Sequence, residues 1–436
     1  MTAATRETTT SSSAQPVAPP GLPRLLPAAG GRMELSAHLR VHGAAPYRGG
    51  PGMLIHTIEA AGLTGRGGAA FPVHRKLTAV ANQNRTPVVV GNGAEGEPAS
   101  DKDKTLLWSS PHLVMDGLQL AAEAVGAKKA YLYVHREPAL VARLQSALDE
   151  RAAAGLDRLG VTMVTAPARF LAGEESALAN RVEGGAALPR FTPPRIFERG
   201  VGGAPTLVQN VETLAQLALI SRYGPAWFRS VGTADEPGSM LTTARLANGD
   251  GGVAEAAIGV PIAELLRLTE HPAQAVLVGG YHGAWLSPKQ AGQLTLSNAD
   301  LRPIGAAVGA GVLAALPADR CGVIESARVL RYLALESAGQ CGPCLNGLPL
   351  IADAFAALAN RRAAPSTRGD LARWSKLVER RGACHHPDGT VRFLRSTLTV
   401  FAGEVRLHEA GQCSAGSYEP FLPIPAGSPE HKDDWS

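Results

Sequence analysis

Alternating strands and helices in the first half of the chain most constrain how it can fold. Residues 86–90 (T-P-V-V-V) and 130–134 (A-Y-L-Y-V) are short runs rich in β-branched and aromatic residues, which predict buried strands. Apolar residues at helical spacing over 112–125 and 138–151 separate them from each other and from a third strand at 161–164. This order predicts an α/β fold with a parallel sheet and crossover helices.

The second half of the chain contains two regions with different predicted secondary structure. Short strands at 240–245 and 275–278 flank one helix at 262–268, which predicts a small mixed domain like a β-grasp insertion. Helical patterns then dominate and predict a C-terminal bundle with helices at 324–335, 348–359, 370–380 and 389–401. We therefore expect a disordered tail at 1–34, an α/β domain at 35–236, a β-grasp domain at 237–320, a helical domain at 321–415 and a second tail at 416–436.

Composition excludes several classes of protein. Lys and Arg number 42 against 38 Asp and Glu, and no basic stripe is interleaved with aromatics, so nucleic acid is not an expected partner. No run of about 18 apolar residues predicts a membrane span, and the Ala-, Thr-, Ser- and Pro-rich start lacks the order of a secretory signal. Five cysteines in 436 residues do not form a disulfide scaffold, so we expect a cytoplasmic protein.

A glycine-rich segment at 62–72 reads G-L-T-G-R-G-G-A-A-F-P. Glycines allow the backbone to approach a ligand and to direct several N–H groups at one anion. Arg66 and Lys76 could neutralise the charge of that anion. The segment does not match the nucleoside-triphosphate P-loop. Taken alone, it predicts either a phosphate cradle or a surface turn.

Three further segments combine glycine with acidic or amide side chains. They are 91–104 (G-N-G-A-E-G-E-P-A-S-D-K-D-K), 173–177 (G-E-E-S-A) and 205–213 (P-T-L-V-Q-N-V-E-T). The first of them follows a predicted strand, and loops at the carboxyl ends of parallel strands commonly bind ligands. Four such segments in one chain favour a ligand site over unrelated surface turns.

Together, the four segments resemble the FMN- and NADH-binding (F-type) subunit of respiratory complex I and its relatives in soluble hydrogenases and formate dehydrogenases. The family pattern G-R-G-G-x-G-F-P-T-G-x-K is matched by Gly65, Arg66, Gly67, Gly68, Phe71, Pro72 and Lys76. The later segments match at Asn92, Glu95, Gly96, Glu97, Gly173, Glu174, Glu175 and Asn210. The resemblance keeps the same order from about residue 50 to about residue 405.

The resemblance implies an FMN-binding parallel-sheet domain, an SLBB-like β-grasp insertion and a helical domain with an iron–sulfur site. It assigns FMN binding to the matched residues other than Phe71 and Pro72, and assigns the NADH side to Phe71, Glu97 and Glu175. We add Arg195 to the NADH side from its own chemistry, since it does not match the family pattern. The implied activity is that of an NADH dehydrogenase subunit, in which FMN oxidises NADH and electrons pass singly to an iron–sulfur cluster. The implied acceptor is a ferredoxin or a thioredoxin-like 2Fe–2S subunit, with a membrane-bound redox partner as a further option.

Departures from the family pattern affect mainly the nucleotide side. Family glycines are replaced by Ala70 and Ala99, and the family stretch L-K-P-P-F reads F-T-P-P-R at 191–195, without its lysine and its last aromatic ring. The guanidinium of Arg195 could stack on an adenine or pair with a phosphate. We therefore keep two alternatives to NADH oxidation: a ferredoxin-linked FMN module that no longer binds NADH, and a non-catalytic relic that makes protein contacts.

The cysteine motif is incomplete. Cys341, Cys344 and Cys384 match three of the four cluster ligands of the family, but Ala338 stands at the fourth position. Because a 4Fe–4S cluster normally takes four thiolates, we expect such a cluster with one atypical ligand, for which Cys413, Cys321, His385 and His386 are candidates. The other options are a non-protein ligand or a three-iron cluster, zinc at the same residues, or a lost cluster whose cysteines are ordinary small residues.

Overall fold

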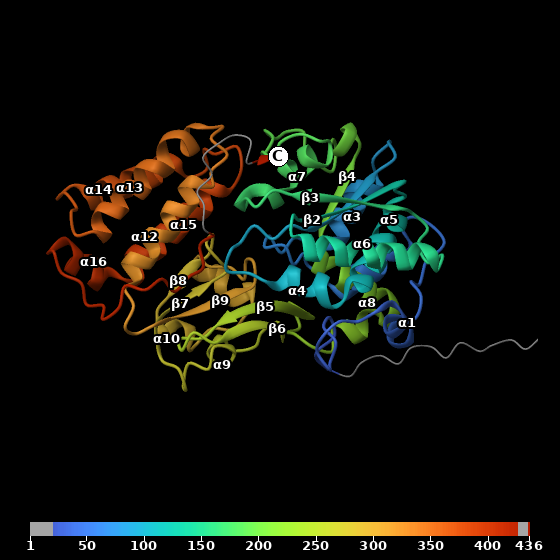
Figure 1. Cartoon of the computed structure of the whole chain (residues 1–436), viewed down its shortest axis with the longest axis horizontal. Helices are drawn as coiled ribbons and strands as arrows, with labels where there is room; N and C mark the ends of the chain where they lie inside the picture. The colour runs from blue at the N-terminus through green and yellow to red at the C-terminus, as the bar shows by residue number, and fades with distance from the viewer. Residues whose placement is uncertain (1–20, 426–434) are drawn as a thin grey trace, which may run out of the picture.

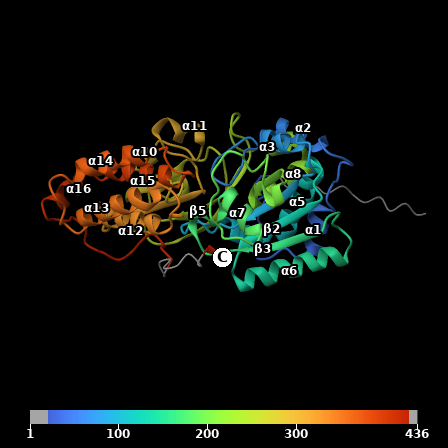
Figure 2. The same ribbon diagram turned by 90° about the horizontal axis from the view of Figure 1, so that it is seen from above.

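The computed structural model describes residues 21–425 and 435–436. Figure 1 shows a parallel-sheet part, a second sheet below the centre, and a helical bundle at one end. Seen from above, the bundle lies at the opposite end of the long axis from α6 (Pro138–Ala153) (Figure 2). The predicted fold class, an α/β parallel sheet followed by a C-terminal helical region, is confirmed.

The first sheet is entirely parallel, with strand order β3-β2-β1-β4. Its strands are β1 (Val88–Gly93), β2 (Lys129–His135), β3 (Val161–Ala166) and β4 (Thr206–Asn210). Alternate side chains enter two cores. One core faces α5 (Pro111–Val125) and α8 (Val211–Phe228), and the other faces α7 (Glu175–Val182). Side chains at the carboxyl end of this sheet are therefore held by packing on both faces.

Helices α5 and α8 approach each other unusually closely. A Cβ placed on Gly117 of α5 would lie 2.0 Å from the carbonyl oxygen of Leu214 on α8, so this crossing requires glycine. Helices α1 (Leu35–His42), α2 (Met53–Ala61), α3 (Val73–Ala81) and α4 (Lys102–Ser109) complete this part of the molecule. The glycine-rich segment connects α2 to α3. The close contact with α5 positions α8, whose first turn lies beneath the glycine-rich segment.

The second sheet has five strands in the order β6-β5-β9-β7-β8. They are β5 (Ser239–Arg245), β6 (Gly251–Ala257), β7 (Ala273–Val278), β8 (Ala284–Leu286) and β9 (Val312–Pro317), with short helices α9 (Ile262–Leu265), α10 (Pro288–Ala291) and α11 (Asn298–Leu301). One face of this sheet packs on the bundle, where the indole N–H of Trp285 donates to Ser326 Oγ at 3.0 Å. The insertion and the bundle therefore share a core.

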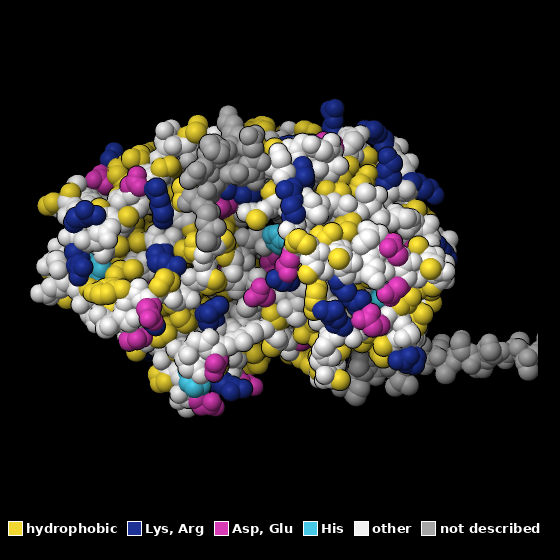
Figure 3. All heavy atoms as spheres, viewed as in Figure 1, with side chains coloured by type: hydrophobic (Ala, Val, Ile, Leu, Met, Phe, Trp, Pro, Cys, Tyr) yellow, Lys and Arg dark blue, Asp and Glu magenta, His cyan; other side chains and the backbone are white. Residues whose placement is uncertain are grey.

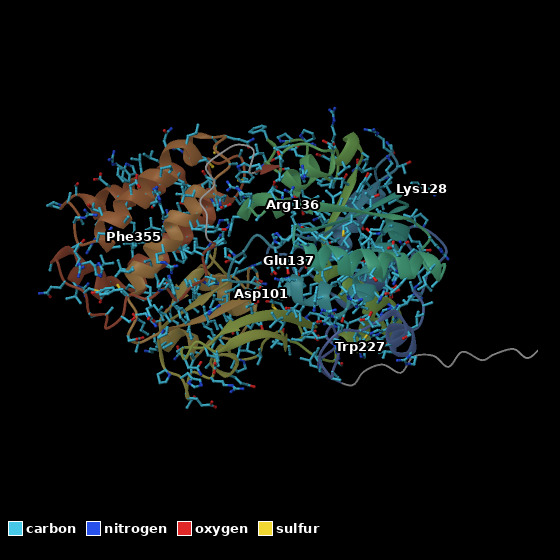
Figure 4. The ribbon with its side chains drawn as sticks, in the orientation of Figure 1. Asp101, Lys128, Arg136, Glu137, Trp227 and Phe355 are labelled. Carbon is cyan, nitrogen blue, oxygen red and sulfur yellow. The ribbon has the colours of Figure 1, made fainter. Side chains whose placement is uncertain are left out.

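The bundle contains α12 (Gly322–Leu335), α13 (Leu348–Ala359), α14 (Thr367–Val378), α15 (His386–Val400) and α16 (Ala402–Glu409). A five-residue π-helical turn, Pro343–Gly347, precedes α13. Phe355, labelled in Figure 4, is fully buried among the bundle helices. The four predicted helices are present within a few residues of their expected ends, and α16 is a fifth helix that the periodicity did not indicate.

The prediction of a disordered tail through residue 34 is wrong for the part that the structure describes. Leu25 is buried, and Arg24 stacks on Trp227 (labelled in Figure 4) with 4.0 Å between the guanidinium carbon and the ring centroid. The backbone N–H groups of both residues donate to Glu255 on β6. Residues 1–20 lie outside the described chain. Residues 21–34 are thus packed on the rest of the molecule, although their composition is typical of disorder; Arg32 also stacks on Trp108, and the Met33 N–H donates to Ser109.

The prediction of a loose C-terminal tail is also wrong where the chain is described. Leu422 is buried, and its N–H donates to Glu325 of α12 at 3.1 Å. Trp435 is buried beneath the guanidinium of Arg169, and Arg136 (Figure 4) donates to the carbonyl of Ser436 at 2.8 Å. Residues 426–434 lie outside the described chain. The last residues thus contact the parallel-sheet part.

The surface carries charges of both signs. On the face shown in Figure 3, Lys and Arg are interspersed with Asp and Glu. That face therefore offers no extended field of one sign for long-range steering. Among the described residues, none of the helices has the length and apolar character needed to cross a bilayer.

Candidate functional site

The glycine-rich loop lies against the first turn of α8. The N–H of Gly65 donates to the carbonyl of Phe71 at 2.9 Å and closes the loop, and the N–H of Arg66 donates to Thr213 Oγ1 at 2.9 Å. A Cβ on Gly67 would lie 3.3 Å from Cβ of Asn210, the residue that caps α8. Gly68 has φ +106°, which only glycine adopts readily. The arrangement brings a flexible backbone to a helix N-terminus, where N–H groups and the helix dipole favour an anion.

The Arg66 side chain does not take the role predicted for it. Its guanidinium is buried and donates to the carbonyls of Ser239 at 3.1 Å and Thr64 at 3.1 Å. It also contacts the carbonyl of Pro237. The expectation that Arg66 neutralises a bound phosphate is wrong here, because the group is directed into the junction with the second sheet. Arg66 fixes the loop to β5 instead.

Three polar side chains form a row across the carboxyl end of the parallel sheet. The strand register pairs Asn92 of β1 with Tyr133 of β2 on one side and with Asn210 of β4 on the other. The Tyr133 hydroxyl is buried and has no hydrogen-bond partner among the described residues. A buried donor without a partner is costly, so a ligand with acceptor groups at this edge would satisfy it. This row, together with the loop over α8, fits a polar cofactor such as FMN.

The second and third segments pack directly on each other. Asn92 Nδ2 donates to the carbonyl of Gly173 at 2.9 Å. A Cβ on Gly96 would lie 2.1 Å from the carbonyl oxygen of Phe170, and one on Gly173 would lie 2.5 Å from that of Ala94. Gly96 and Gly173 were predicted to be at the cofactor. Here they are required because a side chain at either position would clash with the facing backbone.

A buried charge network holds the second segment on α8. Lys102 Nζ lies 2.6 Å from Asp103 Oδ1 and 3.0 Å from Glu212 Oε2, and the N–H of Asp103 donates to Glu95 at 3.1 Å. Burial raises the pKa of Glu95, and the charge of Asp103 raises it further. Asn210 Nδ2 donates to Asp103 Oδ2 at 2.6 Å. Glu95 and Asn210 are therefore positioned by the same network.

The Glu97 carboxylate faces the second sheet. It accepts the N–H of Tyr281 at 2.7 Å and that of Ala99 at 3.2 Å, and a Cβ on Gly280 would lie 2.4 Å from it. Burial raises its pKa to about 7, although the two amide hydrogen bonds oppose the shift. Each Glu97 oxygen thus accepts one backbone N–H from the second sheet or from its own loop, and its place on the nucleotide side stays a prediction.

The remaining predicted acidic residues lie at the start of α7. Glu174 caps this helix by accepting the N–H groups of Ser176 and Ala177, each at 3.0 Å. Glu175 is half-exposed and forms an ion pair with Lys76. Glu175 and Lys76 therefore neutralise each other, and a phosphate near Lys76 would have to compete with this carboxylate.

Three side chains predicted on or near the nucleotide side are exposed. Phe71 has 51% of its surface exposed and Phe191 has 77%. Arg195 is exposed, and its backbone N–H donates to Glu198 at 2.8 Å. Large exposed aromatic rings often mark contact sites, so these groups are available to a partner or a nucleotide.

Three cysteines converge beside the third segment. Cys344 is buried, and burial together with the neighbouring Cys341 and Cys384 raises the pKa of its thiol. Burial also raises the pKa of Cys384, with Glu174 among the charges that act on it. Glu336, between α12 and the cysteine motif, accepts the N–H of Phe170 at 2.9 Å. The cysteine site thus adjoins the loops at the end of the parallel sheet.

Three of the four candidates for the fourth cluster ligand lie apart from the other cysteines or are bonded elsewhere. Cys413 lies beside Cys321 at the N-terminus of α12, whereas the cysteine motif follows its C-terminus; the 14 residues of this helix span about 21 Å. The prediction of Cys413, and the alternative of Cys321, is therefore wrong. His386 Nε2 lies 2.8 Å from the Leu333 carbonyl and its Nδ1 lies 3.0 Å from His282. The side chain of His385 is fully exposed.

Sequence reasoning missed a cluster of rings where the three parts meet. The Phe170 ring lies 4.6 Å from that of His282 and 5.6 Å from that of His386, measured between centroids, and Tyr332 packs edge-on at 6.1 Å. The G-G-Y-H-G motif around His282 looks like an ordinary turn, so no sequence signal indicated this cluster. It connects the third segment, the second sheet and the start of α15.

Comparison with known proteins places this geometry among flavoproteins. Residues 58–219 match the family model of the Nuo51 FMN-binding domain, and residues 325–408 match that of the NADH-ubiquinone oxidoreductase-F iron-sulfur binding region. The F 2 subunit of the NADH-quinone oxidoreductase of Rhizobium meliloti (strain 1021) is 29% identical over 378 residues, which cover 82% of this chain and 89% of the relative. The F subunit of the enzyme of Rickettsia typhi (strain ATCC VR-144 / Wilmington) is 27% identical over 381 residues, covering 82% and 89%.

A solved hydrogenase structure also matches this chain. The NAD+-reducing [NiFe]-hydrogenase in its air-oxidised state superposes with a TM-score of 0.75 at 30% sequence identity. The match covers 86% of this chain and 64% of the hydrogenase chain. This chain therefore spans somewhat less than two thirds of that hydrogenase chain.

Proposed function

We propose that this chain, which belongs to the F-type family of NADH oxidoreductase flavoprotein subunits as a divergent member, oxidises NADH with bound FMN and passes electrons through an iron–sulfur cluster to a protein acceptor. FMN, when bound, supplies the conversion between hydride transfer and single-electron transfer. One observation carries the proposal. The third segment contacts both halves of the site: the Gly173 carbonyl accepts from Asn92, and Glu174 lies beside Cys384.

The residues proposed to hold FMN divide into two groups. Backbone N–H groups around Gly65, Gly67 and Gly68, with the N-terminus of α8, would bind its phosphate. Asn92 and Asn210 would orient its polar groups from the sheet edge, where Asp103 of the buried charge network holds Asn210 and the Gly173 carbonyl holds Asn92. The arrangement leaves Arg66 as a support for the loop rather than a contact to the cofactor.

The nucleotide would be bound by the exposed groups at the mouth of the site. Phe71 offers a ring for stacking, and Arg195 offers a guanidinium for an adenine or a phosphate. Glu175 and Lys76 lie nearby on α7 and α3 as an ion pair. Stacking on Phe71 would also shield the flavin side of the site from water.

The cluster would be held by the thiolates of Cys341, Cys344 and Cys384. The three sulfurs converge, which fits a cluster, but the described residues supply no fourth thiolate beside them. We infer that the fourth iron takes a non-protein ligand or that the cluster has three irons. Among the described residues, only a different group has three or more ligand atoms within 4.8 Å of one another, so a single zinc ion at these cysteines is disfavoured.

The acceptor would be another protein. The relatives are named as subunits of NADH-quinone oxidoreductase, and the matched structure is a hydrogenase. We infer a ferredoxin or a thioredoxin-like 2Fe–2S subunit as the direct acceptor. The cysteine motif lies on the side of the bundle that adjoins the parallel sheet, so an acceptor would dock where Leu345 is exposed beside Cys344.

A second function is favoured by two observations on the nucleotide side. The Glu97 carboxylate is bonded to the backbone of Tyr281 and Ala99, and Arg195 replaces the family phenylalanine. Both features favour a ferredoxin-linked FMN module that does not use NADH. The two functions differ in whether NADH reduces an artificial one-electron acceptor in the presence of this protein.

The test is steady-state reduction of ferricyanide by NADH under anaerobic conditions. We expect turnover, and we expect Phe71→Ala to raise KM for NADH about 2- to 10-fold, because a stacking ring contributes about 0.5–1.5 kcal/mol beyond its buried area. Tyr418→Ala removes an equally exposed ring from the C-terminal segment and should leave KM unchanged. Absence of turnover in protein that contains FMN and iron would contradict NADH oxidation and favour the ferredoxin-linked module.

A further inference from the structure

Four metal-binding side chains meet at the end of the bundle farthest from the flavin loops. They are Cys321, Glu404, His408 and Cys413, and their ligand atoms all lie within 4.8 Å of one another. Cys321 caps the N-terminus of α12, while Glu404 and His408 stand one turn apart on α16, which Figure 1 shows at the outer end of the bundle. Cys413 follows α16 in the segment that returns toward α12. Three separate pieces of chain thus supply one ligand set.

The three distances among Cys321, Glu404 and His408 are those of a tetrahedral site. Cys321 Sγ lies 3.3 Å from His408 Nε2 and 3.8 Å from Glu404 Oε1, and the last two atoms are 3.3 Å apart. Zinc bonds of about 2.0–2.3 Å to nitrogen, oxygen and sulfur give tetrahedral edges of about 3.3–3.8 Å. An ion could therefore enter the group with little movement of these side chains.

The surroundings of the group also suit a metal. The Nδ1–H of His408 donates to the carbonyl of Leu358 at 3.2 Å, which leaves the lone pair of Nε2 directed at the other ligands. Glu404 accepts the N–H of Ser414 at 3.0 Å, and this contact positions the neighbouring Cys413. Cys321 and His408 are buried, with 4% and 1% of their surfaces exposed. Each ligand is thus held by a partner outside the group or by packing.

We propose that Cys321, Glu404, His408 and Cys413 bind one structural Zn²⁺ ion, separate from the iron–sulfur cluster. Two thiolates, an imidazole and a carboxylate fill all four positions of a tetrahedral zinc ion, so no position remains for a substrate. Binding would release the two thiol protons to solvent and form two Zn–S bonds without any change in oxidation state. The ion would fasten the segment after α16 to the start of α12, where Arg320 also bonds Ser417 at 2.6 Å.

Metal analysis of the full-length protein, purified anaerobically without added zinc, tests the proposal. We expect one zinc per chain, and we expect the double variant Cys321→Ser/Cys413→Ser to lose it while keeping its iron. Cys341→Ser is the matched control, because it removes a cluster cysteine and should lower iron but not zinc. If the double variant does not fold, His408→Gln replaces it as the test. This variant changes a single ligand and should lower zinc occupancy.

Several results would overturn the zinc site. Wild-type protein without stoichiometric zinc would do so, and so would a Cys321–Cys413 disulfide found by non-reducing peptide mass spectrometry. Loss of iron and sulfide, with zinc retained, in the Cys321→Ser/Cys413→Ser variant would instead assign these cysteines to the cluster.

Discussion

Ala70 offers the sharpest test of the loop geometry. It stands where the family has glycine, and its φ is +51°, in the left-handed region that side chains with a Cβ avoid. Ala99 also replaces a family glycine, but its backbone does not enter the left-handed region. The same substitution at the two positions therefore isolates the backbone strain of the glycine-rich loop.

The magnitude follows from two opposing effects. An L-residue in the left-handed region costs about 1–2 kcal/mol, which Ala70→Gly would relieve. The added glycine also increases the entropy of the unfolded chain and costs about 0.5–1 kcal/mol at either position. We expect Ala70→Gly to raise the free energy of unfolding by up to about 1.5 kcal/mol and Ala99→Gly to lower it by about 0.5–1 kcal/mol, since only the first relieves strain.

Urea unfolding of the FMN-loaded protein, followed by far-ultraviolet circular dichroism, would measure both variants under one condition. The entropy effect cancels in the comparison, so the two variants should differ by about 1–2 kcal/mol with unchanged m-values. Equal changes at the two positions would show that Ala70 is not strained and would refute the loop conformation.

Three further perturbations test other parts of the site. Ala338→Cys adds a thiolate at C-x-x-C spacing before Cys341, so loss of cluster absorbance in air should slow; an unchanged rate would argue against a missing ligand there. Glu97 has a raised pKa in the folded protein, so wild-type stability should fall by about 3 kcal/mol relative to Glu97→Gln as pH rises from about 4.5 to about 7, and parallel pH curves would contradict this. Arg66→Met removes the donors to Ser239 and Thr64 and should lower the free energy of unfolding by about 3 kcal/mol or more, because buried carbonyls lose their partners. Weaker FMN binding with unchanged stability would instead indicate that Arg66 contacts the FMN phosphate.

The parts of the fold with strong periodicity could be predicted from sequence. Strands β1 to β3 and helices α5, α6 and α12 to α15 have clear patterns, and their observed ends are within a few residues of the expected ones. Helix α8 was missed because its first ten residues are all buried and show no polar face. Strand β4 was missed because its five residues were interpreted as part of a ligand loop. The packed terminal segments depend on single anchors such as Leu25 and Leu422, which composition cannot indicate.

Motifs predicted which residues gather at the site but not the direction of each side chain. Arg66 and Glu97 match the family pattern, yet both side chains face the second sheet, because their partners are backbone groups of β5 and of the turn before β8. Cys321, His408 and Cys413 could not be connected from sequence at all. Cys321 is 87 residues from His408, so no short motif contains both. Only the fold of the bundle brings them together.

Reduction of a bound flavin by NADH is the step on which the proposed function depends. An anaerobic titration of the purified protein with NADH, followed by its visible spectrum and completed with dithionite, measures this step. We predict flavin absorbance that bleaches with stoichiometric NADH and changes little further with dithionite. Flavin bands that bleach only with dithionite or reduced ferredoxin would contradict NADH oxidation, and a colourless protein that takes up neither FMN nor iron would contradict both proposed functions.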